Sequence, residues 1–342
     1  MSLRRLLLVM FAALAAIAGA YYLSAQRNLV RDLNGTALLP GLAAQLNSVS
    51  SVSISKGGPA PAVTVHRVGD RWAVEQLGDY PADTPKLRRL LLALGDAKIV
   101  EEKTSNPANY AALGVDDPAK AGAAGAEITW ETPGGRHSLI VGKPAGQGVF
   151  VRRAAESQSF LVEPAIPLDA QPRLWIDGRL LDVPVATVRS ITVKFADGTG
   201  YTLQRSSPKD ESFALEDVPA GRKARDTAAL APSPTLLAGL TAEDVGPAGT
   251  VDDAKAATAA ITTSDGAVLT LHGVVAQDKH WVTITATGND ALTAKAAGRA
   301  FELAGNRYEA IFRPLDELLV PKQTPAAKSA PRKQKSAPHP HP

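Results

Sequence analysis

The six histidines of the chain are the residues best suited to bind a metal ion or transfer protons near neutral pH. They are His66, His137, His272, His280, His339 and His341. None has a second histidine four residues away together with an acidic neighbour, the spacing of a zinc-binding helix. The first four lie in predicted strands, and we interpret each as a solvent-facing strand residue. The last two alternate with prolines near the C-terminus, where disorder is expected and weak metal binding is the alternative.

Nucleophiles and phosphate-binding loops are no better supported. The chain has no cysteine, which excludes disulfides, thiolate zinc sites, cysteine nucleophiles and an acylated lipoprotein anchor. No serine lies in a G-x-S-x-G nucleophile elbow. Gly142-Lys143-Pro144 resembles the end of a phosphate loop, but the upstream glycine spacing is missing, no hydroxyl residue follows the lysine, and proline lacks an N–H.

Paired acids and tryptophans are the remaining residues that can support chemistry. Asp116-Asp117 and Asp252-Asp253 are interpreted as turn-forming and capping residues, with metal binding as the alternative. Glu101-Glu102 is interpreted as a solvated face. The tryptophans can pack in a core or form a ligand platform, and we predict core packing for Trp72, Trp130, Trp175 and Trp281. The residues therefore predict no catalytic, cofactor-binding or metal-binding site, and no enzyme.

Length and charge set the next limits. With 342 residues the chain can form two domains, each large enough to bury a core. Its formal charge is +3, but five lysines and arginines, without an acid, lie in residues 322–342. Removing those five from +3 leaves −2 for residues 1–321, so the body of the chain is mildly acidic. We therefore exclude nucleic acid as a partner of the globular part.

The N-terminus predicts export. Arg4 and Arg5 precede an uncharged run over residues 6–23, which as a helix would span roughly 27 Å, enough for the hydrocarbon core of a membrane. Positive charges before the run favour a cytoplasmic N-terminus and an exported remainder. The alternatives are a signal peptide cleaved after Ala18-Gly19-Ala20, or a buried helix of a soluble domain. We predict an uncleaved anchor in the cytoplasmic membrane through residues 6–23.

The first half of the body alternates apolar and polar residues as antiparallel strands do. Residues 51–55, 63–67 and 71–75 form three such segments, with Gly69-Asp70 as a tight turn. A helix then begins at Asp83-Thr84-Pro85 and carries leucines at positions 87, 90, 91 and 94, which form one apolar face. A second group of strands is predicted for residues 127–132, 137–142, 149–153 and 159–163.

The same series of segments recurs about 140 residues later. Residues 190–194, 201–205 and 213–216 repeat the first three strands, and Trp72 is replaced by Phe213. A helix is predicted to start at Ser233-Pro234, with apolar residues 236, 237, 242 and 245. Ile261-Thr262 and residues 268–272 are aligned with Ile128-Thr129 and residues 137–141, and residues 280–285 are aligned with residues 149–153. A last helix is predicted from Asn306 to Leu319.

One family resemblance follows from short motifs in a fixed order. The motifs are Gly69-Asp70-Arg71-Trp72-Ala73-Val74, Tyr80-Pro81-Ala82-Asp83, Lys103-Thr104-Ser105, Leu113-Gly114-Val115 and Leu139-Ile140-Val141-Gly142-Lys143. Together they resemble the bacterial domain of unknown function 4340, over most of residues 47–320. The resemblance implies an exported protein with a single anchor, often encoded beside membrane subunits of gliding-type ABC transporters. It brings no catalytic residues to carry over.

These observations predict an α+β fold of two tandem repeats, each an antiparallel sheet covered by a helix, after an N-terminal transmembrane helix. The predicted divisions are residues 1–26 (anchor or signal segment), 27–46 (juxtamembrane linker), 47–178 (first repeat), 179–321 (second repeat) and 322–342 (disordered basic tail). The bulk of the chain is predicted to lie on the periplasmic side of the bacterial inner membrane.

The expected function is a non-enzymatic accessory role in an ABC-type transport complex or another cell-envelope complex, exerted by protein–protein contact. The first alternative is a module that binds an envelope glycan or small solute in a groove between the repeats. A hydrolase of an envelope polymer is a further alternative, which requires two acids converging in a cleft. The sequence gives no indication of the oligomeric state.

Overall fold

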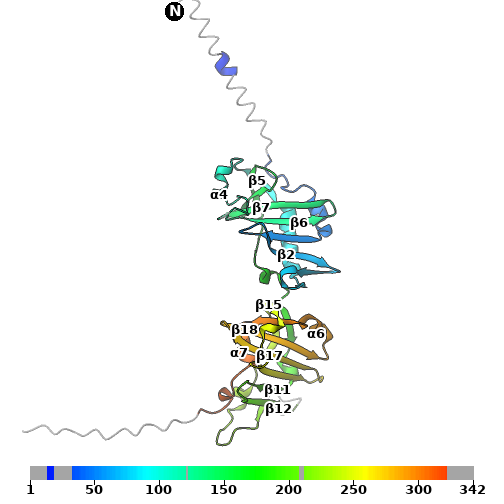
Figure 1. Ribbon diagram of the computed structural model, residues 1–342, viewed down its shortest axis with the longest axis vertical. Helices are drawn as coiled ribbons and strands as arrows, with labels where there is room; N and C mark the ends of the chain where they lie inside the picture. Colours follow the sequence, from blue (N-terminus) through cyan, green and yellow to red (C-terminus); the bar gives the residue numbers. More distant parts are fainter. Residues whose placement is uncertain (1–13, 19–32, 121, 208–211, 322–342) are drawn as a thin grey trace, which may run out of the picture. The chain divides into compact units, whose positions relative to one another are not determined.

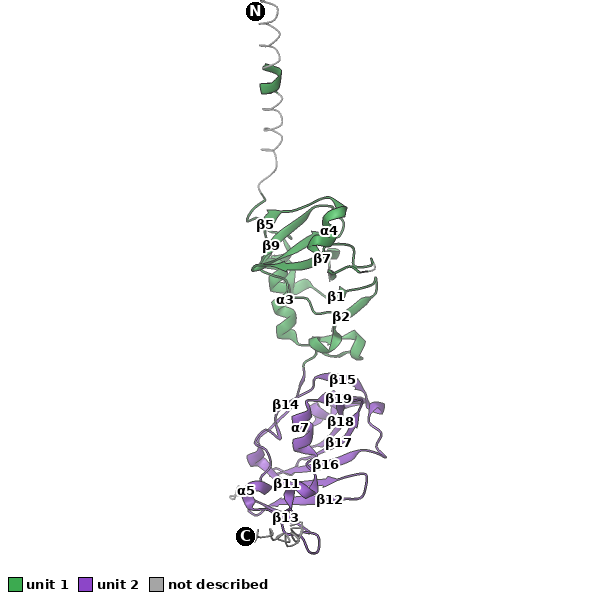
Figure 2. Cartoon of the chain, turned by 90° about the vertical axis from the view of Figure 1, so that its left-hand side faces the viewer, with its two compact units in different colours: residues 1–177 green, residues 178–342 purple. Residues whose placement is uncertain are grey.

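The computed structural model describes residues 14–18, 33–120, 122–207 and 212–321. The chain divides into two compact units, residues Met1–Asp177 (unit 1) and Gly178–Pro342 (unit 2) (Figures 1 and 2). Both consist mainly of antiparallel sheet with a few helices, so the predicted α+β class is confirmed. Only residues 14–18 of the predicted membrane segment, residues 6–23, are described, and the tail over 322–342 lies outside the described residues. No described helix has both the length and the apolar character needed to cross a membrane.

Unit 1 contains one nine-stranded sheet in the order β4-β3-β2-β1-β6-β7-β8-β9-β5. Its strands are β1 (Ser51–Ser55), β2 (Pro61–Val68), β3 (Arg71–Val74), β4 (Tyr80–Pro81), β5 (Lys98–Glu102), β6 (Ala126–Thr132), β7 (Gly135–Ala145), β8 (Gly148–Arg153) and β9 (Ser159–Glu163). The strands predicted from alternation are present. The edge strand β5 was not predicted, because its pairing with β9 joins residues about sixty positions apart.

The predicted helix is α3 (Thr84–Asp96), which lies against one face of this sheet (Figure 2). Asp83 caps it by accepting a hydrogen bond from the Lys86 backbone N–H at 2.9 Å, and its four stripe leucines are buried. The smaller helices are α2 (Leu42–Gln45), η1 (Leu46–Ser48), η2 (Glu75–Leu77), η3 (Pro107–Asn109), α4 (Tyr110–Leu113) and η4 (Pro172–Trp175). Residues 33–46 of the predicted linker belong to the fold of unit 1, because Leu38 is fully buried and its N–H bonds to the Ala97 carbonyl.

The face of the sheet beneath α3 forms the main core of unit 1. Val52 of β1 lies opposite Val65 of β2 and Trp130 of β6, and all three side chains are buried. The opposite face carries a smaller cluster, in which Tyr110 and Val115 from the segment after β5 pack on the sheet. Antiparallel sheets commonly bury one face more fully than the other, and this pattern accounts for the alternation in the sequence.

Unit 2 contains an eight-stranded sheet in the order β13-β12-β11-β16-β17-β18-β19-β15 and a separate two-stranded sheet of β10 and β14. The strands are β10 (Arg179–Val183), β11 (Val188–Lys194), β12 (Gly200–Arg205), β13 (Phe213–Glu216), β14 (Leu237–Thr241), β15 (Asp244–Pro247), β16 (Ala257–Thr263), β17 (Val268–Ala276), β18 (Lys279–Thr287) and β19 (Arg299–Leu303). Its helices are η5 (Val185–Thr187), α5 (Thr227–Leu230), η6 (Ala248–Thr250), α6 (Asp290–Ala296), α7 (Gly305–Ile311) and η7 (Leu315–Leu318).

The helix predicted from Ser233 is wrong. Residues 237–241 form β14, which pairs with β10, and the only helix nearby is the single turn α5. Gly239 has a left-handed φ of +56°, which interrupts a helix, and Leu237 and Leu240 are buried as residues of the small sheet. The last helix is also shorter than predicted, since α7 ends at Ile311 and Pro314 precedes the separate turn η7.

The main core of unit 2 is covered by other elements than the long helix that covers the core of unit 1. Ile191 lies opposite Leu203 and Ile261 on one face of the sheet, and all three are buried. Helix α7 approaches the same sheet at Gly273, where a Cβ would lie 2.4 Å from the Phe312 ring. Only glycine permits this close approach, so Gly273 determines how tightly the segment after α7 seals the core.

Candidate functional site

An open groove of about 800 Å³ lies in unit 1 between α2–η1, α3 and the hairpin of β2 and β3. We name it the arginine groove, because Arg67, Arg88 and Arg89 line it and no acidic residue does. Its apolar lining includes Leu46 and Trp72. Residues 1–321 carry a net negative charge, whereas the lining of this groove is positively charged.

Helix α3 supplies one wall of the arginine groove. Residues Pro85, Arg88, Arg89 and Leu92 are spaced at i, i+3, i+4 and i+7, and therefore share the side of the helix that points away from the leucine core. Leu92 is 47% exposed, so its side chain remains accessible for contact. The wall thus presents two cations beside an apolar side chain.

The second wall comes from residues far away in the sequence. A Cβ at Gly95 would lie 3.2 Å from Leu46 Cδ1 and 3.4 Å from the Cα of Ala43, so the absence of a side chain lets the end of α3 approach α2 and η1 closely. This contact joins the two walls at one end of the groove.

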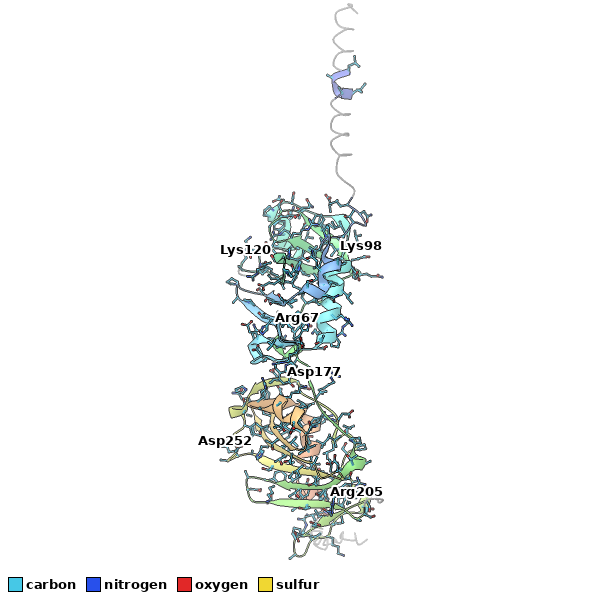
Figure 3. All side chains as sticks on the ribbon, turned by 90° about the vertical axis from the view of Figure 1, so that its right-hand side faces the viewer. Arg67, Lys98, Lys120, Asp177, Arg205 and Asp252 are labelled. Atoms are coloured by element: carbon cyan, nitrogen blue, oxygen red, sulfur yellow. The ribbon has the colours of Figure 1, made fainter. Side chains whose placement is uncertain are left out.

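Arg67, labelled in Figure 3, is held by two contacts. Its guanidinium lies 4.7 Å from the ring centroid of Trp72, and its Nε donates to the Val49 carbonyl at 3.3 Å. Trp72 is 9% exposed and provides a rigid support for the cation. Arg88 and Arg89 are exposed, and their side chains form no hydrogen bond or ion pair with any residue that the structure describes.

A second cavity, of about 520 Å³, lies in unit 2 beneath α7. We name it the Tyr201 pocket. Its lining is largely apolar, with Ile191 and Leu203 from the sheet, and Arg313 and Glu317 at its polar side. Arg313 donates to the Ala229 carbonyl at 2.6 Å, and its Nε lies 3.7 Å from a Glu317 carboxylate oxygen. Burial raises the pKa of the Tyr201 phenol, and the nearby Arg313 opposes that rise only in part.

Tyrosine ionisation in this region yields a test of stability at alkaline pH. Burial raises the pKa of Tyr308 to about 12, from 10.0 in its unperturbed state. The unfolded chain therefore loses this proton first, so the stabilisation is complete below about pH 10 and is lost as pH rises towards 12. We expect the unfolding free energy of unit 2 to fall across this window, and Tyr308→Phe to reduce the fall. Denaturant unfolding at several pH values, combined with tyrosinate absorbance, measures both; an equally steep fall in the Tyr308→Phe variant would contradict the assignment.

The histidines are dispersed, and several are less exposed than predicted. His66 Nε2 lies 3.1 Å from an Asp79 carboxylate oxygen, and the rings of His280 and Tyr308 are 4.9 Å apart, so neither is simply solvent-facing. His137 is exposed and stacks on Trp130. Within the described ranges, no group of three or more His, Cys, Asp or Glu residues has a geometry that could hold a metal ion.

The remaining motifs have structural roles. Gly142-Lys143-Pro144 lies within β7, and Lys143 Nζ donates to the carbonyls of Ala111 and Ala112 at the end of α4, at 3.3 and 3.0 Å. Asp117 and Asp252 accept backbone hydrogen bonds two residues ahead, which confirms the turn interpretation. The core packing predicted for the tryptophans is confirmed for Trp72, Trp130 and Trp175, whereas Trp281 is half-buried.

Trp72 was considered from the sequence, but Arg88, Arg89 and Leu92 were not singled out as site residues. The available signal was Leu92, an apolar residue on the charged side of the helix. The leucine stripe of α3 accounted for the neighbouring leucines and left Leu92 unexplained.

The sequence model of the family described as Domain of unknown function (DUF4340) matches residues 72–260. The matched region begins at Trp72 in β3 and ends in β16, and it covers more than half of the chain. No curated protein and no solved structure matches the chain.

Proposed function

Because the chain belongs to the family of the domain of unknown function DUF4340, whose description names no activity, we propose a function from its own residues. The protein is a non-enzymatic, membrane-anchored accessory component of an ABC-type transport or other cell-envelope complex, and it acts by protein–protein contact. The uncharged run over residues 6–23, after Arg4 and Arg5, supports an anchor with the body on the periplasmic side of the bacterial inner membrane.

The two units are two copies of one module. Unit 1 has the partial strand order β3-β2-β1-β6-β7-β8-β9-β5, and unit 2 has β13-β12-β11-β16-β17-β18-β19-β15. Each strand of the second sheet takes the place of the strand numbered ten lower in the first. A shared order of eight antiparallel strands, including the return of β5 and β15 to the far edge, supports duplication more strongly than the short sequence fragments do.

Hydroxyl pairs at matched positions also support duplication. Ser53 of β1 lies opposite Thr64 of β2, and their hydroxyl oxygens are 3.2 Å apart. Thr192 of β11 lies opposite Thr202 of β12, and the corresponding oxygens are again 3.2 Å apart. Cross-strand pairs of this kind contribute to sheet stability at the same place in each unit.

The best-matched pair combines an arginine with an aromatic ring. Arg67 lies opposite Trp72, and Arg205 lies opposite Phe213; each guanidinium is 4.7 Å from the centroid of its ring. Arg67 and Arg205 are labelled in Figure 3. Both arginines also donate through Nε to a backbone carbonyl, that of Val49 just before β1 and that of Val188 at the start of β11. The replacement of Trp72 by Phe213 preserves the stacking, which indicates a packing role for the indole.

The strand registers correct one detail of the alignment between the residues of the two units. Ile261 lies opposite Ile191, and Trp130 lies opposite Val52, which is the counterpart of Ile191. Ile261 therefore corresponds to Trp130, two residues later than Ile128, with which the sequence pattern aligned it. Short segments that alternate with period two can be aligned equally well after a shift of two residues, because the inward and outward positions are preserved.

The arginine groove is the observation that carries the proposed contact function. It occurs where the two modules differ, since unit 1 covers its main core with α3 and unit 2 covers the same core with α7 and its flanking segments. The groove combines three arginines and no acidic residue with Trp72 and the exposed Leu92, and enrichment in arginine and aromatic side chains is typical of surfaces that bind a partner.

Purification of the tagged full-length chain from membranes in mild detergent tests the proposed function. We expect at least one membrane protein to be recovered reproducibly with it. Recovery of the chain alone in repeated preparations, at detergent concentrations that preserve known membrane complexes, would contradict the proposal.

Binding of a small solute is the second candidate, and the Tyr201 pocket favours it. This pocket lies within unit 2, and its volume of about 520 Å³ is in the range of small-molecule sites. A mostly apolar lining with a phenol and a guanidinium at one side suits an amphipathic solute.

A further inference from the structure

We propose that the arginine groove binds an acidic, amphipathic helical segment of a partner protein. This inference rests on the proposed contact function and names the chemistry of the partner. The apolar side chains of the segment pack against Leu46 and Leu92, and its carboxylates pair with Arg67, Arg88 and Arg89.

The apolar contribution comes from both walls. Leu92 on α3 is 47% exposed, and Leu46 on η1 is half-buried across the groove. Covering these aliphatic side chains removes apolar surface from water, which stabilises a complex. Residues 85 to 92 of α3 extend over roughly 10 Å, which corresponds to two turns of a partner helix.

The charge contribution comes from cations that have spare hydrogen-bonding capacity. Arg88 and Arg89 have no partner among the described residues, and Arg67 uses only its Nε, so its terminal nitrogens are available. A guanidinium binds a carboxylate through two parallel hydrogen bonds, which a lysine cannot reproduce. No carboxylate lines the groove to compete with that of a ligand.

The shape of the site favours a protein segment over a lipid surface. A flat anionic membrane requires only exposed cations, whereas this site is a groove whose lining combines three arginines with apolar residues from α3 and η1. An apolar recess with charges along its rim is the arrangement by which grooves recognise amphipathic helices.

A fluorescence experiment tests the inference on the full-length chain in discs of neutral lipid. The chain has no cysteine, so Asn47→Cys, at an exposed position in the lining of the groove, provides a unique site for an environment-sensitive dye. The probe is an amphipathic peptide of leucine and glutamate, with leucines at i, i+3, i+4 and i+7. We expect a saturable blue shift of the dye. The double substitution Arg88→Glu and Arg89→Glu should weaken peptide binding by about tenfold or more.

A matched control changes charge by the same amount elsewhere. Arg136 on β7 and Arg189 on β11 are exposed, and their side chains form no hydrogen bond or ion pair with the residues that the structure describes, so Arg136→Glu with Arg189→Glu should leave binding unchanged. Equal losses in the two double variants would overturn the inference, because the effect would then follow total charge. Equal binding of a leucine–lysine peptide would also overturn it.

Two further outcomes separate the possible sources of failure. A blue shift in discs of anionic lipid without peptide, combined with no response to peptide, would assign the groove to the membrane and overturn the inference. If the Arg88→Glu and Arg89→Glu variant still co-purifies with the membrane partner of the wild-type chain, the accessory function stands and the groove is not its contact site.

Discussion

Phe160→Ala is expected to destabilise unit 1 by about 3–5 kcal/mol and to leave the unfolding of unit 2 unchanged. Phe160 is 2% exposed and lies opposite Val151 in the sheet of unit 1. Its removal leaves a cavity in a core that α3 closes on one side, and a close-packed core collapses into such a space only partly. Each unit has its own core, so the loss should remain local.

Phe301 provides a matched experiment in the other unit. It is fully buried and lies opposite Val282, the counterpart of Val151 in the duplicated arrangement. Phe301→Ala should therefore destabilise unit 2 by a similar amount and spare unit 1. Calorimetry of the full-length chain measures both transitions, and each variant is the control for the other. A single transition that shifts equally in both variants would show that the two units unfold together.

Much of the sheet architecture was predictable because its information is local. The alternation of residues 51–55 and 63–67 indicates strands, and the Gly69-Asp70 turn joins β2 to β3 in a hairpin. Helix α3 was predicted from an N-cap at Asp83 or Thr84 and from its leucine stripe; the structure places the cap at Asp83 and buries the stripe. In these segments, propensity, pattern and turn chemistry favour the same structure.

The failures occur where long-range pairing decides the structure. Leu237 and Leu240 fit the spacing of an apolar helix, but they lie in β14 because β10, more than fifty residues earlier, offers a pairing partner. Gly239 with its left-handed φ was the local signal against a helix. Strand preferences depend on neighbours across the sheet more than helix preferences depend on tertiary context, so such segments are difficult to assign from local pattern.

The candidate site was less predictable than the fold. The arginine groove requires η1 to lie beside α3, and the Gly95 contact that brings Leu46 to the helix spans about fifty residues of sequence. Arg88, Arg89 and Leu92 are ordinary surface residues when α3 is considered alone. They become a candidate site only when a second wall faces them, and no motif encodes that second wall.

Gly142→Ala is expected to cost about 3 kcal/mol, although the residue lies in a strand and an alanine there is chemically mild. A Cβ at Gly142 would lie 2.4 Å from the carbonyl oxygen of Leu113 and 2.9 Å from that of Gly114. These are backbone atoms, so the segment after α4 must move away from β7. That movement exposes Val115, which is fully buried, and breaks the hydrogen bonds of Lys143 to the end of α4.

Gly134→Ala is the control for this effect. Gly134 lies in the turn between β6 and β7, and the nearest atom to a Cβ there is the Thr132 hydroxyl at 3.5 Å, an ordinary contact. We expect its free energy of unfolding to stay within about 0.5 kcal/mol of the wild-type value. The two variants distinguish two reasons for a glycine before Lys143. If the glycine is needed for close packing of α4, alanine lowers the free energy of unfolding. If the segment were a phosphate loop, alanine would leave the fold stable and weaken only anion binding. Equal stability of the two variants, measured by urea unfolding, would refute the packing explanation.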